Sequence, residues 1–250
     1  MQSEVIAFAN QKGGVGKSTD VLNLAAIKAS QGKRVLMIDL DPNPSLTTLC
    51  GMEPYPSPNV SHLLCGENHL FECGYPVEKS GLDTLFLVPS DTKLAETKDT
   101  LIPKIGREQI LKNAIDPFKS EFDYIFIDCP PELGVLTLIA LTAADKVVIP
   151  TEAEYTTFRR VLDLHNTIET IKKAYNNELS FIGYIINSFE IRVNDQKDML
   201  AEYEKKGKVL GTVRKTANVY KNVNKGLPVS LAIPKCNVSE DYRKIARKIK

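Results

Sequence analysis

The sequence predicts a doubly wound α/β fold, which is a mostly parallel sheet covered by helices on both faces. Short unbroken apolar segments alternate with helical patterns along the chain, and a Gly-rich loop follows the first apolar segment. Unbroken apolar strands are typical of parallel sheets, because such sheets are buried on both faces. With 250 residues, of which 43% are hydrophobic, the chain is long enough for one complete core. We therefore expect a single domain over residues 1–250.

The strands and helices are expected in alternating order. Buried strands are predicted at residues 4–10, 34–40, 82–90, 124–131, 146–151 and 181–188. The helix after the first strand has on one face Val21, Leu24, Ala25 and Ala29. Further helices are predicted near residues 105–118, 133–143, 155–176 and 194–206. Residues 51–81, rich in Pro, Gly and Ser, are expected to form a loop with one short helix.

The first strand leads into a Gly-rich loop and then a helix. The loop reads Lys12-Gly13-Gly14-Val15-Gly16-Lys17-Ser18-Thr19. In this context backbone N–H groups surround phosphate oxygens, and the helix N-terminus adds partial positive charge. Lys17 is placed to meet the β- and γ-phosphates, and the Ser18 hydroxyl to ligate Mg²⁺. The loop therefore predicts a P-loop NTPase that binds ATP and Mg²⁺.

Two other predicted strands end in carboxylates, at the edge of the sheet where ligands bind in this class of fold. Asp128 can orient Mg²⁺ through a water molecule, or it can cap the next helix. Asp41 follows the segment 34–40 and precedes a proline, so it can also be a turn-forming residue.

The loop departs from the standard pattern G-x-x-x-x-G-K-[ST], because Gln11 stands at its first glycine and Lys12 follows. It resembles the deviant Walker A motif K-G-G-x-G-K-[ST] of the ParA, MinD and nitrogenase iron-protein superfamily. The likeness to ParA and Soj proteins extends over nearly the whole chain. It includes the segments FANQKGGVGKST, IDLDP, DYIFIDCPPELGVLTLIALTAAD and VVIPTEAEY.

The resemblance implies two catalytic residues and a base contact. The first lysine of the motif reaches the partner's phosphates across a nucleotide-sandwich dimer, which assigns that role to Lys12. The second Asp of the D-x-D-P-Q segment serves ATP hydrolysis, which assigns the positioning of water to Asp41. Asn43 replaces the usual Gln, which leaves the hydrolysis rate open. Asn187 lies where relatives place a residue near adenine, although a strand-end turn explains it equally well. Asp20 replaces a Thr or small residue, and we expect it to point away from the nucleotide.

Charge is distributed unevenly along the chain. Residues 192–250 hold 15 Lys/Arg and 6 Asp/Glu, whereas residues 1–191 hold 17 and 25. This asymmetry favours an anionic partner such as DNA, although a solvated basic face is the alternative. We expect no helix-turn-helix domain before the P-loop, and therefore only non-specific contacts with phosphates. The candidate DNA-binding residues are Arg192, Arg214, Lys215, Lys221 and Lys225.

The resemblance implies an ATPase that dimerises with ATP, binds DNA non-specifically and segregates plasmid or chromosomal DNA with a ParB-like centromere-binding protein. The alternative is a MinD-like membrane-associated ATPase, which would need an apolar C-terminal helix. The stripe of Val238, Tyr242, Ile245 and Ile249 is narrow, so we expect it to pack on the domain and expect no membrane.

The cysteines bear on compartment and on electron transfer. An electron-transfer ATPase would need two cysteines per chain at suitable strand and loop ends, which Cys50, Cys65 and Cys73 match poorly. The odd, dispersed set of cysteines and the lack of a signal peptide favour a cytoplasmic, nucleoid-associated protein.

Overall fold

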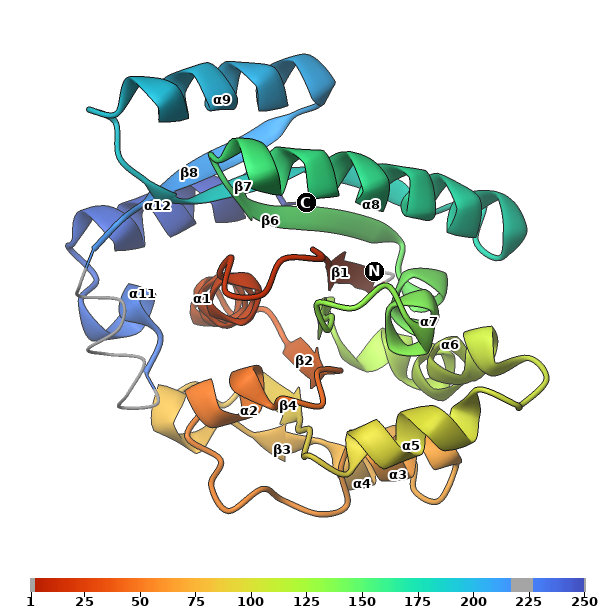
Figure 1. Cartoon of the computed structure of the whole chain (residues 1–250). Helices are drawn as coiled ribbons and strands as arrows, with labels where there is room; N and C mark the ends of the chain where they lie inside the picture. The colour runs from red at the N-terminus through yellow and green to blue at the C-terminus, as the bar shows by residue number, and fades with distance from the viewer. Residues whose placement is uncertain (1–2, 217–226, 250) are drawn as a thin grey trace.

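The computed structural model describes residues 3–216 and 227–249, and its strands form one eight-stranded sheet (Figure 1). The strand order is β3-β4-β2-β5-β1-β6-β7-β8. The strands are β1 Glu4–Phe8, β2 Val35–Asp39, β3 Tyr75–Pro76, β4 Leu85–Val88, β5 Tyr124–Asp128, β6 Lys146–Glu152, β7 Ser180–Phe189 and β8 Val209–Arg214. Within the described residues, β3 pairs antiparallel with β4 and the other pairs are parallel. The predicted mostly parallel sheet is confirmed.

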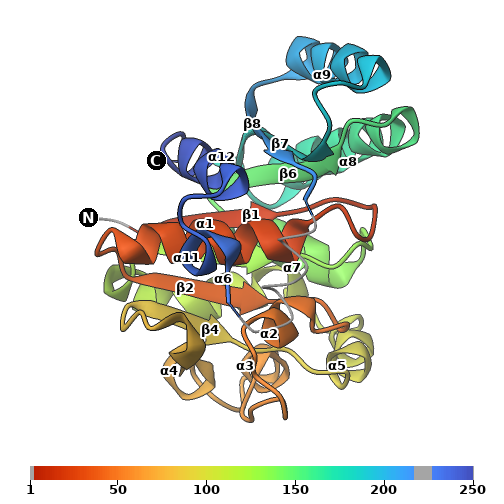
Figure 2. The same ribbon diagram turned by 90° about the vertical axis from the view of Figure 1, so that its left-hand side faces the viewer.

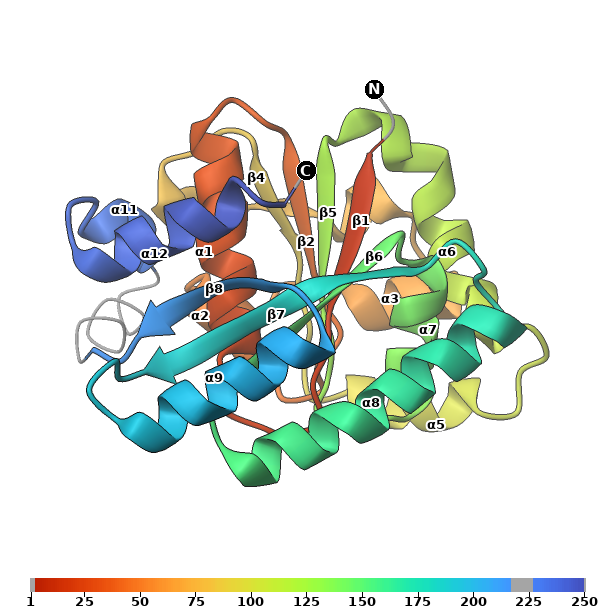
Figure 3. The same ribbon diagram turned by 90° about the horizontal axis from the view of Figure 1, so that it is seen from above.

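Helices cover both faces of this sheet, as predicted (Figure 3). One face carries α1 Lys17–Ser30, α2 Ser45–Leu49, α11 Val229–Ala232 and α12 Asn237–Ala246. The other face carries α3 Val60–Cys65, α4 Leu70–Cys73, α5 Leu94–Leu101, α6 Ile110–Ile115, α7 Val135–Ala143, α8 Tyr155–Ala174 and α9 Asn194–Lys206. Successive strand residues point to opposite faces, so a buried strand of the sheet contributes to both apolar cores. In β1, for example, Val5 and Ala7 pack in one core, and Ile6 and Phe8 pack in the other.

The C-terminal helix α12 packs against α1 and β8 (Figure 2). Its apolar stripe of Val238, Tyr242 and Ile245, continued by Ile249 after the helix, is at most 3% exposed and belongs to the same core as α1. Gly211 of β8 makes this packing possible, because a Cβ there would lie 2.6 Å from Cγ1 of Ile245. The prediction that the tail packs on the domain is confirmed.

Several elements differ from the prediction. Residues 51–81 contain α3, α4, β3 and a 3₁₀ turn at Glu78–Ser80 where one short helix was predicted. Sequence patterns do not predict these helices and this strand, because the elements are only two to six residues long and lie between prolines and glycines. Neither α5 nor β8 was predicted, since α5 buries only Leu94 and Leu101, and Gly211 interrupts the apolar run of β8. Over the residues described here, no helix is both long and apolar enough to span a membrane.

Candidate functional site

A cavity of about 670 Å³ lies at the C-terminal ends of the central strands. It is lined by residues 13–19, Asp41, Asn43, Ser45, Leu49, Pro131, Asn187, Ser188, Val213, Arg214, Lys215, Thr216 and Tyr242. The structure therefore brings together most of the predicted ATP-binding residues with Asp41, from elements far apart in the sequence. Lys12 and Asp128 do not line this cavity.

The conformation of the P-loop depends on contacts with the neighbouring strands. Asn10 is buried, its Oδ1 accepts the Lys12 backbone N–H at 3.0 Å, and its Nδ2 donates to the Pro150 carbonyl at 2.6 Å. Gly16 precedes α1 with φ 93°, a left-handed conformation that L side chains rarely adopt. The free N–H groups of the first turn of α1 therefore point toward the loop, as anion binding requires.

Lys17, Ser18 and Asp128 meet below the loop. Lys17 is 7% exposed and Asp128 is 1% exposed. Both oxygens of Asp128 lack a hydrogen-bond partner of standard geometry within the described residues. Burial raises the pKa of Asp128 to about 7, while the Lys17 ammonium and the Ser18 hydroxyl oppose that rise. A buried carboxylate without a partner, next to a hydroxyl, fits the outer ligand shell of Mg²⁺.

Asp39 and Asp41 have different surroundings, although both follow β2. Asp39 is fully buried, and its oxygens accept hydrogen bonds from the Asp41 backbone and from the backbone and hydroxyl of Thr47. Asp39 therefore orders the loop. Asp41 lines the cavity and also accepts the Asn43 backbone N–H at 2.9 Å, so it forms the predicted turn. Burial raises the pKa of Asp41, and the Lys17 ammonium is among the groups that lower it.

Lys12 is held by two carboxylates, one at the end of β6 and one just after it. Its Nζ lies 2.6 Å from Glu152 and 2.7 Å from Glu154. Burial lowers the pKa of Lys12, but the two carboxylates outweigh that effect and leave it raised. Neither glutamate was a sequence candidate. The available signal was a pair of acids next to the predicted strand 146–151, at the edge where ligands bind.

Asn187, at the end of β7, is joined to the P-loop. Its Nδ2 donates to the Val15 carbonyl at 2.8 Å and to Asp20 Oδ2 at 2.7 Å. The Tyr242 hydroxyl donates to Asp20 Oδ1 at 2.8 Å. Asp20 is fully buried and does not line the cavity, so its side chain is directed at β7 and α12.

The basic candidates for DNA contact have mixed surroundings. The Arg214 guanidinium pairs with Asp241 through Nε at 3.0 Å and Nη2 at 2.8 Å, a partner that the sequence did not predict. Lys215 lies 2.9 Å from Glu190, and Arg192 is exposed. The other two candidates, Lys221 and Lys225, lie outside the described residues.

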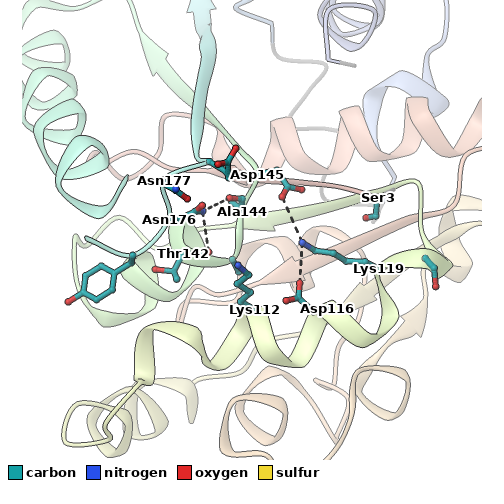
Figure 4. A pocket seen from close by; sticks show the side chains of 13 residues that line it. Ser3, Lys112, Asp116, Lys119, Thr142, Ala144, Asp145, Asn176 and Asn177 are labelled. Atoms are coloured by element: carbon teal, nitrogen blue, oxygen red, sulfur yellow. Dashed lines mark hydrogen bonds and ion pairs between the residues drawn. The ribbon is translucent and has the colours of Figure 1, made fainter. Parts of the chain in front are cut away.

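A second cavity, of about 610 Å³, lies at the opposite, N-terminal ends of the strands (Figure 4). Lys119 lies there between Asp116 at 3.2 Å and Asp145 at 3.8 Å. The Asn176 amide donates to the Ala144 carbonyl at 2.7 Å, at the end of α7. These polar groups bind one another and close the end of the domain, so we assign no ligand to this cavity.

The chain is similar to known proteins along most of its length. Residues 3–181 match a protein-family model described as an AAA domain. The sporulation initiation inhibitor protein Soj of Bacillus subtilis strain 168 is 34% identical over 250 residues, which cover 98% of each chain. The chain belongs to the ParA/Soj family of ATPases. The chromosome partitioning protein ParA of Myxococcus xanthus is 33% identical, over 98% of this ParA/Soj-family chain and 87% of that protein.

A solved structure extends the comparison to a bound ligand. It is described as cobyrinic acid a,c-diamide synthase from Mycobacterium smegmatis with bound ATP analog and magnesium. Its TM-score with this ParA/Soj-family chain is 0.82 at 31% identity, over 98% of this chain and 93% of the other. The fold that places the cavity is therefore shared with a protein that binds an ATP analog and magnesium.

Proposed function

We propose that this ParA/Soj-family chain is an ATP-driven dimerisation switch that binds DNA non-specifically. With a ParB-like partner, it segregates plasmid or chromosomal DNA on the nucleoid. The observation that carries the proposal is the cavity in which the P-loop, Asp41 and Asn187 converge, with Lys12 next to it on the loop. The named Soj and ParA relatives support the same role.

The residues divide the work of binding Mg-ATP. Backbone N–H groups of residues 13–19 surround the phosphates, and the Lys17 ammonium neutralises the β/γ charge. Ser18 would ligate Mg²⁺ and Asp128 would orient it, and the metal would supply charge neutralisation at the phosphates. Asn187 meets the base. Thus Lys17, Ser18 and Asn187, which line the cavity, each have a matching group on Mg-ATP.

Asp41 positions the water that attacks the γ-phosphate. Replacing Asp41 with alanine should therefore trap the ATP-bound dimer, because the groups that bind phosphate remain while the acid that orients water is lost. We expect turnover to fall by about 100-fold, the lower range for a general acid–base group. Release of phosphate and the lifetime of the dimer in ATP are the measurements, with the partner protein present because basal turnover is slow.

The matched control is Asp99→Ala, which removes an exposed carboxylate of α5 that does not line the cavity and should leave turnover unchanged. Unchanged turnover in Asp41→Ala itself would exclude Asp41 from the reaction.

DNA binding should require ATP, because a dimer doubles the cations that face the duplex. One protomer with a few phosphate contacts binds at about 10⁻⁴–10⁻⁶ M in physiological salt. Joining two protomers adds contacts without a second loss of translational freedom, so affinity rises steeply. The log–log salt slope should steepen by about 0.9 for each further phosphate neutralised. A gel shift on duplexes of unrelated sequence, with ATP, ADP or no nucleotide, measures this.

Charge reversal at Lys221 or Lys225 should weaken binding to all sequences alike and leave turnover intact. Equal DNA affinity with ADP and ATP would contradict the switch, and no binding even at low salt would contradict the partition role. The MinD-like alternative would then be tested with anionic liposomes. That alternative would have to expose the stripe of α12 and Ile249, whose four apolar side chains are at most 3% exposed.

A further inference from the structure

The Asn187 amide has one orientation that its surroundings permit. Its Nδ2 faces two oxygen acceptors, the Val15 carbonyl at 2.8 Å and Asp20 Oδ2 at 2.7 Å. Turning the amide over would place Oδ1 against both oxygens and lose both hydrogen bonds. Oδ1 makes no hydrogen bond within the described part of the chain, and Asn187 lines the cavity. The group that Asn187 offers to a ligand is therefore an acceptor.

Asp20 is held in place from a third element. It is fully buried, and its Oδ1 accepts the hydroxyl of Tyr242, which is itself 1% exposed on α12. Burial raises the pKa of Asp20 to about 8. An ionised Asp20 accepts both hydrogen bonds, whereas a protonated one donates from Oδ1 to the Tyr242 oxygen and still accepts at Oδ2. Asn187 therefore meets an acceptor in either protonation state.

The backbone next to Asn187 is strained. Ser188 has φ 54°, a left-handed conformation that is costly for a residue other than glycine, and the pairing of β7 with β8 shifts register there. A Cβ on Gly16 would lie 2.8 Å from Asn187 Nδ2, so the amide sits directly against the loop. Such strain persists only where the surrounding contacts enforce it.

We propose that Asp20 is a positioning residue that sets base specificity: by holding Nδ2 of Asn187, it makes Oδ1 face the base and select a 6-aminopurine over a 6-oxopurine. The inference rests on the proposed function, in which Asn187 meets the base. Adenine carries an amino donor at position 6, and guanine carries an oxygen acceptor there. Two acceptors facing each other leave both groups without a partner in a desolvated site, which disfavours guanine.

The test is calorimetry with Mg-ADP and Mg-GDP. Diphosphates are used because they bind without being hydrolysed during the titration. The wild-type chain should bind ADP at least about tenfold more tightly than GDP, the effect of about one hydrogen bond. The diphosphate of purine riboside, which has hydrogen at position 6, should lose a similar factor relative to ADP. These measurements test Oδ1 of Asn187 as an acceptor in the wild-type protein, so they do not depend on the folding of any variant.

Two variants then test Asp20 itself. Asp20→Leu keeps the branching at Cγ, although it is larger, and has no acceptor, so it should reduce the ADP/GDP ratio about tenfold by weakening ADP while GDP affinity changes little. Asp20→Asn keeps an acceptor oxygen for Nδ2 of Asn187 and an amide donor for the Tyr242 oxygen, so it should preserve the ratio. Thermal unfolding of each variant establishes that it is folded before binding is measured.

The outcomes separate this inference from the proposed function. Equal binding of ADP and GDP by the wild type would overturn the base selection and leave the ATPase role standing. A wild type that binds no nucleotide would overturn the ATPase role as well. A folded Asp20→Leu with an undiminished ratio, or an Asp20→Asn that behaves like it, would overturn the positioning role of Asp20.

Discussion

Replacing Lys17 with alanine is expected to abolish measurable binding of Mg-ATP. Lys17 is 7% exposed beneath the P-loop, where we propose that its ammonium meets the β- and γ-phosphates. Charge-assisted hydrogen bonds contribute about 1.5–3 kcal/mol each, so losing two of them lowers affinity by about 100-fold or more. Burial already raises the pKa of Asp128, and removal of the opposing lysine would raise it further. Calorimetry with Mg-ATP measures the loss.

A matched control is available on the same polypeptide. Lys33→Ala removes an equal charge from a lysine that pairs with Asp123 at 2.9 Å and does not line the cavity. Its ATP affinity should equal that of the wild type. Near-native affinity in Lys17→Ala would show that the backbone of the loop is sufficient to bind Mg-ATP and that Lys17 does not contribute to binding.

The parts of the fold that depend on local sequence were predictable. The segments 34–40, 124–131 and 146–151 each contain an unbroken apolar run, and each coincides with a strand of the central sheet to within a few residues. The P-loop was predictable because its chemistry is contained in consecutive residues. Strand β8 was not predictable, because Gly211 interrupts its apolar run. The glycine is needed there for close contact with α12, which is a cause that lies outside the strand.

The contacts around the site were less predictable, since they join residues far apart in the sequence. The ion pairs of Lys12 with Glu152 and Glu154 span 140 and 142 residues. The sequence shows that Asp20 replaces a Thr or small residue of the family and predicts that it points away from the nucleotide. It does not predict which residues contact Asp20. The structure shows that it bonds to Asn187 and to Tyr242, at separations of 167 and 222 residues. No local pattern reports such pairs.

Lys12 should behave in the opposite way to Lys17 when it is replaced. Lys12→Ala is expected to bind ATP within about threefold of the wild type, because Lys12 does not line the cavity of its own protomer. It should fail to dimerise with ATP, since the target we propose for its ammonium is the partner's nucleotide. Sedimentation velocity with ATP and with ADP distinguishes the two states, and Lys33→Ala again controls for the loss of a paired lysine.

The ion pairs of Lys12 are weak enough for its ammonium to exchange them for phosphates on a partner. Its side chain is 27% exposed and that of Glu154 is 52% exposed, so water already competes for the ion pair. Such exposed pairs contribute about 0–1 kcal/mol, which a triphosphate with its greater charge can replace. We therefore propose that the two glutamates hold Lys12 at the edge of the site until a nucleotide on a partner attracts it. An ATP-bound dimer of Lys12→Ala as tight as the wild type would contradict the action in trans, and the glutamate contacts would then be structural alone.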